Sequence, residues 1–161
     1  MIVGPTLTSE RVSTPEGIAK IMNRDIPGIP NMTMPTVDVR DVALAHVRAL
    51  HTEGLHGKRI IINKESMTMV ALADTLNEEF AKFGYRVQTR RIGYCPLKLV
   101  SFFDDQVKTV LPLIGVQLTA DNNLSKQLLG LTYAERDLRQ SVIDMGYSLI
   151  EMGLVPDKRG S

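Results

Sequence analysis

Short runs of β-type residues alternate along this chain with segments in which apolar residues recur every three or four positions. Such an alternation is typical of mixed α/β folds. Strands are expected at 34–39, 58–63 and 85–92. Helices are expected to begin near Thr14, Asp41, Ser66 or Thr68, Pro96, Asp121 and Thr132. We therefore predict an α/β fold with a few short strands and about six helices.

Local patterns make some of these expectations specific. The three isoleucines at 60–62 predict a buried strand of the kind found in parallel sheets. Segment 85–92 has arginine and glutamine on one face, which predicts a strand at the edge of a sheet. Thr132 and Glu135 have the spacing of a capping box, which predicts the start of the last helix. The apolar, proline-containing stretch 26–31 is predicted to be a loop without regular structure.

Composition excludes several classes of protein. The chain has 161 residues, which is enough for one domain, predicted at 1–155 with a flexible tail at 156–161. It contains 19 Lys and Arg against 18 Asp and Glu, so no basic excess indicates a nucleic-acid partner. No apolar run approaches the roughly 20 residues of a membrane span, and no signal peptide is evident. A single cysteine is typical of a reducing compartment, so a cytoplasmic protein is expected.

Motifs that by themselves define a nucleotide or catalytic site are missing from the sequence. It contains no G-x-G-x-x-G loop, no P-loop and no G-x-S-x-G elbow. Tyr94 and Lys98 have the Y-x-x-x-K spacing that some dehydrogenases use, a chemistry that requires both side chains on one helix face. Pro96 lies between them and argues against a continuous helix, so the next helix is expected at 97–111. We interpret the Tyr94–Lys98 spacing as a coincidence.

Several side chains that could bind or react with a ligand also have simpler structural interpretations. His46 is expected on the apolar face of a helix, as a buried histidine with one hydrogen bond; a group that reaches a substrate cavity is the alternative. Cys95 is interpreted as an unreactive thiol, the alternative being activation by a helix N-terminus. Arg86, Arg90 and Arg91 are interpreted as a solvated edge that discourages strand pairing. With one cysteine and three scattered histidines, no zinc site is expected.

The segment Val37–His46, with the sequence V-D-V-R-D-V-A-L-A-H, resembles a segment of the extended short-chain dehydrogenases/reductases. The most similar branch contains the dihydroflavonol reductases, cinnamoyl-CoA reductases and aldehyde reductases. Further resemblances occur in the same order and spacing at Ile2–Pro5, Gly57–Ile61, Leu128–Gly130 and Ser148–Leu154. Together they extend over nearly the whole chain. The resemblance thus also implies the NAD(P)-binding Rossmann-type fold of the epimerase/dehydratase superfamily.

Members of that family are about twice as long as this chain. Their glycine-rich nucleotide loop and their Ser and Tyr-x-x-x-Lys catalytic set precede the V-x-G-P segment, which here is Ile2–Pro5. The resemblance therefore implies the C-terminal, substrate-binding half of an NAD(P)H-dependent carbonyl reductase. Such a half would carry no catalytic residue, would be inactive alone and would hold no cofactor alone. The alternative is a stand-alone, non-catalytic module that self-associates or binds an apolar ligand or a partner subunit.

The resemblance also implies which residues border the ligands. Cofactor contacts are expected at Ile2, Val3, and Ser13 or Thr14. Substrate contacts are expected at Ile26, Pro27, Ile29, Met32, Met34, Cys95 and Phe102. Sugar-nucleotide epimerases of the superfamily carry R-D-F/Y where this chain has Met32–Pro35. This difference favours a small apolar carbonyl substrate.

A sheet that begins at the Ile2–Val3 strand leaves one strand edge without a neighbour. Exposed edges and apolar faces of this kind are typical of interfaces. We therefore predict a homo-oligomer in which Ile2–Val3 and the isoleucines at 60–62 pair with another copy.

Overall fold

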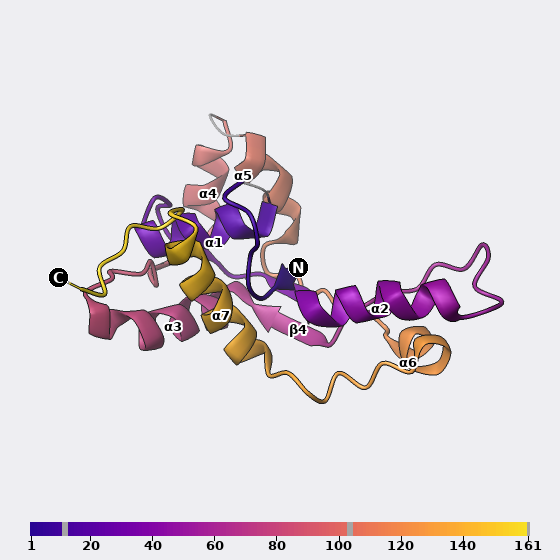
Figure 1. The fold of residues 1–161 in the computed structure, drawn as a ribbon. Helices are drawn as coiled ribbons and strands as arrows, with labels where there is room; N and C mark the ends of the chain where they lie inside the picture. Colours follow the sequence, from indigo (N-terminus) through magenta and orange to yellow (C-terminus); the bar gives the residue numbers. More distant parts are fainter. Residues whose placement is uncertain (11–12, 103–104, 161) are drawn as a thin grey trace.

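The computed structural model describes residues 1–10, 13–102 and 105–160 and shows an α/β fold (Figure 1). The main sheet has the strand order β1-β3-β4, with β1 at Ile2–Val3, β3 at Thr33–Asp38 and β4 at Glu65–Thr68. β1 runs parallel to β3, whereas β4 is antiparallel to it. A separate parallel pair joins β2 at Ile29–Pro30 to β5 at Arg91–Ile92. The predicted α/β class is confirmed.

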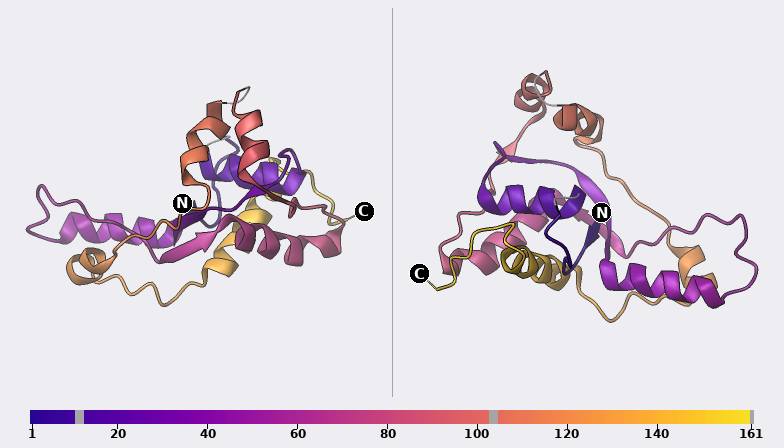
Figure 2. Two further views of the ribbon diagram at one scale, coloured as in Figure 1. Left: turned by 180° about the vertical axis from the view of Figure 1, so that it is seen from behind. Right: turned by 45° about the horizontal axis from the view of Figure 1, so that its top comes forward.

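The helices of the described residues vary from one and a half to four turns. They are α1 (Ser13–Asn23), α2 (Val39–His51), α3 (Met69–Phe80), α4 (Tyr94–Val100), α5 (Asp105–Val110), α6 (Asn123–Leu129) and α7 (Leu138–Glu151). Two 3₁₀ turns, η1 (Ala81–Phe83) and η2 (Leu111–Leu113), follow α3 and α5. Figure 2 shows α4 and α5 as a separate lobe beyond α1. No helix within the described ranges is long and apolar enough to cross a bilayer.

The main hydrophobic core lies between α1, α3, α7 and the sheet. Phe80 of α3 is completely buried, and its ring lies 4.8 Å from that of Tyr147 on α7, measured between centroids. Gly146 permits this close approach, because a Cβ there would lie 2.5 Å from the nearest atom of the Phe80 ring. The absence of a side chain at this one position therefore sets the α3–α7 distance.

A second, smaller core joins α2 to α6 on the right of Figure 1. It contains Val37, Ala45, Leu129, Leu131 and Tyr133. The opposite face of α2 is open to solvent, and Leu50 on that face is 83% exposed. His46 is also exposed, with Nδ1 2.8 Å from the Val42 carbonyl oxygen. The predicted burial of His46 is therefore wrong, because the second core covers the other side of the helix.

The isoleucines at 60–62 do not form the predicted buried strand. They have no ladder partner among the described residues, and Ile61 is 41% exposed. The Asn122 side chain donates to the carbonyl oxygens of Asn63 (2.8 Å) and Lys64 (3.3 Å), so a side chain takes the place of a neighbouring strand. The strand lies instead at β4, directly before the predicted Thr68 cap, whose hydroxyl accepts from the Ala71 amide.

Segment 85–92 is a strand only at its last two residues. The side chain of Gln88, expected on the solvent face, is buried, and its Nε2 donates to the Ile26 carbonyl at 2.8 Å. The Gln88 amide also donates to the Ile21 carbonyl, at 2.9 Å. The predicted loop 26–31 is correspondingly regular at β2, which pairs with β5. Contacts with the end of α1 thus override the alternating pattern.

The expected single helix at 97–111 is also wrong. α4 begins at Tyr94, before the proline, and α5 follows separately; residues 103–104 lie outside the described residues. Pro96 is the third residue of α4, where the backbone amide has no intrahelical partner and a proline is tolerated. Tyr94 and Lys98 therefore do share a helix, and both are exposed.

The last helix begins five residues later than the capping box predicts. Asp137 caps α7 by accepting from the Arg139 amide at 3.1 Å. Thr132 and Glu135 lie in the irregular segment between α6 and α7. Tyr133 in this segment is buried in the second core and has a left-handed backbone (φ 56°), which is incompatible with a helix. The helix ends at Glu151, and Gly153 follows two residues later with a left-handed backbone (φ 73°).

These two candidate caps can be compared by mutation. We expect Asp137→Ala to lower the free energy of unfolding by about 1 kcal/mol, the usual value of an N-cap side chain. Thr132→Ala removes an exposed side chain outside any helix and serves as the control, with almost no change expected. Urea unfolding followed by circular dichroism measures both. A larger loss for Thr132→Ala than for Asp137→Ala would contradict the observed helix start.

Candidate functional site

The carboxyl ends of the parallel strands β1 and β3 lie side by side. In open α/β sheets, ligands bind outside this end of the strands. β1 is followed by Gly4, whose backbone has φ +121° and touches the start of α2: a Cβ at Gly4 would lie 2.8 Å from Val39 Cγ1 and 3.3 Å from Asp38 Oδ2. Only glycine fits this turn without displacing its neighbours. The turn after β1 therefore packs directly against the Asp38 carboxylate at the start of α2.

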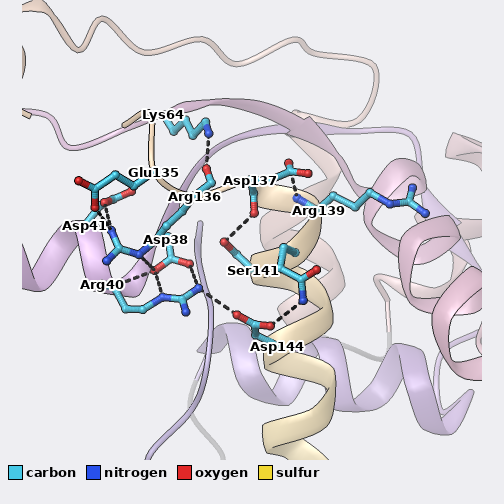
Figure 3. A network of polar contacts seen from close by, with 11 residues as sticks. Asp38, Arg40, Asp41, Lys64, Glu135, Arg136, Asp137, Arg139, Ser141 and Asp144 are labelled. Atoms are coloured by element: carbon cyan, nitrogen blue, oxygen red, sulfur yellow. Dashed lines mark hydrogen bonds and ion pairs between the residues drawn. The ribbon is translucent and has the colours of Figure 1, made fainter. Parts of the chain in front are cut away.

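Asp38 is completely buried and fully hydrogen-bonded (Figure 3). Its Oδ1 caps α2 by accepting from the Arg40 amide at 2.7 Å. The Arg40 guanidinium binds the same carboxylate with both arms, Nε to Oδ1 at 2.8 Å and Nη2 to Oδ2 at 2.7 Å. Burial raises the pKa of Asp38, but the hydrogen bonds from Arg40 outweigh it, so the pKa lies below its usual range. Asp38 is thus ionised at neutral pH.

Two further ion pairs extend this network across the fold. Arg40 Nη2 also binds Asp144 of α7 at 3.0 Å, which ties the start of α2 to the last helix. Arg136 Nη1 binds Asp41 of α2 at 2.7 Å, and Lys64 donates a hydrogen bond to the Arg136 carbonyl. The sequence predicted that Asp41 lies in the first turn of this helix, which is confirmed. Because the carboxylates of Asp38, Asp41 and Asp144 each face a guanidinium, we interpret the network as a scaffold of the sheet edge.

The residues predicted to contact the cofactor lie on the two elements that leave this edge. Ile2 and Val3 form β1, and Ser13 and Thr14 begin α1. The side chain of Val3 is completely buried, whereas Ile2 is 44% exposed. Of these four predicted residues, Ile2, Ser13 and Thr14 therefore have accessible side chains, whereas Val3 does not.

The structure distributes the seven predicted substrate residues over three regions. Ile29 and Met32 are buried in the protein interior, and Met34 pairs with Met67 across the β3–β4 ladder. Ile26 is half-buried and Pro27 is exposed in the loop after α1. Cys95 and Phe102 are exposed on the α4 lobe, Phe102 by 74%. These residues stay a prediction, because none of them lines either of the two cavities described below.

The two cavities occupy places that the sequence did not indicate. The larger, about 490 Å³, lies at the end of α1 and is lined by Arg24, Arg86 and Lys158, among others. The smaller, about 30 Å³, lies between α2 and segment 131–135. Of the lining cations, sequence analysis had singled out only Arg86, as part of a solvated edge. No group of three or more potential metal ligands occurs among the residues that the structure describes.

The chain is similar to NADPH-dependent reductases. It is 28% identical over 123 residues to the NADPH-dependent methylglyoxal reductase Gre2 of Saccharomyces cerevisiae, an alignment that covers 76% of this chain and 31% of that enzyme. The crystal structure of Gre2 from Candida albicans matches with a TM-score of 0.60 and 25% identity, over 95% of this chain and 43% of the other. The fold is the Rossmann-type fold of these reductases.

The fold also occurs in an epimerase. A nucleoside-diphosphate-sugar epimerase from Pseudomonas aeruginosa matches with a TM-score of 0.75, at 14% identity, over 96% of this chain and 47% of that one. No protein-family model matches the chain. The chain spans less than half the length of the proteins that it matches.

Proposed function

We propose that the chain is the substrate-binding part of an NADPH-dependent carbonyl reductase. One observation carries the proposal: the Gre2-like similarity covers most of this chain but only 31% of the yeast enzyme. The sheet supports it, because β1 has a neighbour on one side only in the described residues. A parallel strand from a nucleotide-binding part would complete the sheet at that edge.

The residues present do not form a complete dinucleotide site. The sequence has no glycine-rich loop for the pyrophosphate, and neither cavity is lined by Ile2, Val3, Ser13 or Thr14. In the proposed whole enzyme, bound NADPH would supply the hydride. The role of this part is to present β1 and the start of α1 at one border of the cofactor and to surround the substrate. We accordingly propose no catalytic residue in it.

The proposed substrates are small apolar aldehydes and ketones, and the proposed location is the cytoplasm. Methylglyoxal reduction is the activity named for the yeast relative. Met32–Pro35 replaces the polar R-D-F/Y segment of sugar-nucleotide epimerases, which supports an apolar ligand. A place in the dihydroflavonol reductase-like branch belongs to the same proposal and rests on the V-D-V-R-D-V-A segment at 37–43.

The mass and activity of the endogenous protein test this function. An antibody against α7 captures the protein from source extract, and mass spectrometry weighs it. We expect a mass about twice that of the 161-residue chain and oxidation of NADPH at 340 nm with methylglyoxal or a larger aldehyde.

A mass equal to that of this chain, without NADPH oxidation, would contradict the proposal. It would favour the alternative of a non-catalytic module that pairs through the open edge of β1. The exposed side chain of Ile2 is the observation that supports that alternative. Light scattering then distinguishes a self-associated form from a monomer.

A further inference from the structure

The larger cavity is built from three segments that lie far apart in the sequence. The end of α1 contributes 22–25, the segment after α3 contributes Arg86, and the C-terminal tail contributes Pro156 and Lys158. These segments meet at the left of Figure 1, near the C-terminus. The cavity, about 490 Å³, is an open depression in the surface, because all of its lining residues except Met22 are exposed.

Positive charge predominates in the wall of this cavity. Arg24, Arg86 and Lys158 line it, whereas Asp25 is the one carboxylate among its lining residues. Within the described residues, no hydrogen bond or ion pair engages the guanidinium of Arg24 or of Arg86. The chain as a whole has a net charge of only +1, so the excess is local.

Specific hydrogen bonds fix the segments that carry these cations. Tyr85 Oη donates to the Pro156 carbonyl at 2.7 Å and accepts from the Lys158 amide at 3.0 Å. Buried Gln88 joins the segment of Arg86 to the end of α1 through the Ile21 and Ile26 carbonyls. The cavity is thus a built feature of the fold, held together by buried Tyr85 and Gln88.

The end of α1 explains only part of the charge. A helix C-terminus carries about half a negative charge, which a nearby cation such as Arg24 compensates. Arg86 and Lys158 come from other segments, and with Asp25 counted the wall still has a positive excess. Asp157 does not line the cavity and pairs with Arg159 at 2.8 Å, and the Lys158 ammonium lies 5.2 Å from the centroid of the Tyr85 ring.

We propose that this cavity binds a phosphate group, either the free ion or the phosphate of a small organic phosphate. Guanidinium groups match tetrahedral phosphate oxygens with paired hydrogen bonds, and a lysine adds a point charge. The exposed ring of Pro156 provides an apolar contact for an organic substituent. The site is separate from the β1 edge, so this inference is independent of the proposed reductase function.

Thermal shift measurements with inorganic phosphate, phenyl phosphate and benzoate test the site in the 161-residue chain at constant ionic strength. We expect both phosphates to raise the melting temperature saturably, because a ligand of the folded state stabilises it by mass action. Tighter binding of phenyl phosphate identifies an organic phosphate as the ligand, and equal binding identifies the free ion. Benzoate, with one planar carboxylate, is expected to bind more weakly.

Matched arginine variants locate the binding. Arg24→Gln and Arg86→Gln are each expected to weaken phosphate binding about tenfold, and the double variant more. Arg90→Gln is the control, because Arg90 is exposed on the same segment as Arg86 but does not line the cavity. The proposal is overturned if neither phosphate binds at about 10 mM, or if the double variant binds as tightly as Arg90→Gln.

Discussion

Replacement of Asp38 by alanine is expected to lower the free energy of unfolding by about 3 kcal/mol. The substitution removes three hydrogen bonds from Arg40 at 2.7 to 2.8 Å, one of which is the N-cap of α2. It also leaves the Arg40 guanidinium with Asp144 as its remaining carboxylate. The expected loss combines the N-cap with hydrogen bonds to a completely buried charged group. Little of it comes from a stranded charge, because the Arg40 side chain is 40% exposed.

The C-terminal tail contains a matched control for this substitution. Asp157 and Arg159 have the same spacing and the same three hydrogen bonds as Asp38 and Arg40, but Asp157 is half-exposed. Chemical unfolding of Asp157→Ala should therefore show no measurable change in the midpoint. If the two alanine variants unfold at the same denaturant concentration, burial does not increase the contribution of the Asp38–Arg40 pair to the free energy of unfolding.

The Asp38 pair also predicts how stability depends on pH. The pKa of Asp38 in the folded protein lies below the ordinary value of 3.8. Its contribution to stability is therefore complete above that value and is lost as the pH falls through the lower, folded pKa. Asp38→Asn should reduce the loss of stability below about pH 4 while keeping the shape of the side chain. An unchanged acid profile in this variant would contradict the shifted pKa.

Replacement of Phe80 by alanine is expected to cost about 3–5 kcal/mol of unfolding free energy, the usual range for a buried aromatic residue. Phe80 is completely buried between α3 and α7, with its ring centroid 5.8 Å from that of Tyr85 and 4.8 Å from that of Tyr147. The loss comes from a large cavity and from two aromatic contacts. Differential scanning calorimetry or urea unfolding measures it.

Gly146 provides a second test of the same contact. A methyl group at Gly146 would lie 2.5 and 2.7 Å from two atoms of the Phe80 ring, so Gly146→Ala should destabilise by about 1–3 kcal/mol. Much of this penalty should disappear in the Phe80→Ala background, which a double-mutant cycle measures.

Gly17 is the control for Gly146, because it lies inside α1 and a Cβ there would meet no atom within 4 Å. Gly17→Ala should increase the stability by up to about 1 kcal/mol through the reduced entropy of the unfolded chain. If Gly146→Ala has the same stabilising effect, the close approach of α3 and α7 is not as observed.

The sequence by itself determined the α/β class and most of the points where helices stop or start locally. Thr68 caps α3 as predicted, and Gly84, Gly130 and Gly153 end their helices with left-handed backbones. Such signals depend on residues within one turn of one another, so they are readable without the rest of the fold. The resemblance of 37–46 to reductases agrees with the Gre2-like relatives for the same reason: a contiguous motif survives in the sequence.

Only the tertiary structure decided which of the local signals are used. The capping-box residues Thr132 and Glu135 lie in the irregular segment between α6 and α7, because Tyr133 is buried in the second core. The isoleucines at 60–62 pair with no strand of the described residues; Ile60 and Ile62 pack instead against the second core. In each case, contacts between remote segments outweigh a local preference worth about 1 kcal/mol.

The same reason applies to the charged groups. Asp38 and Asp157 have the same local pattern, yet only Asp38 is buried, because α2 and α7 enclose it. Likewise Arg24, Arg86 and Lys158 are unrelated in the sequence and meet in one cavity only because the tail returns to Tyr85. Burial and the meeting of distant side chains depend on the whole chain at once, and local patterns contain no information about them.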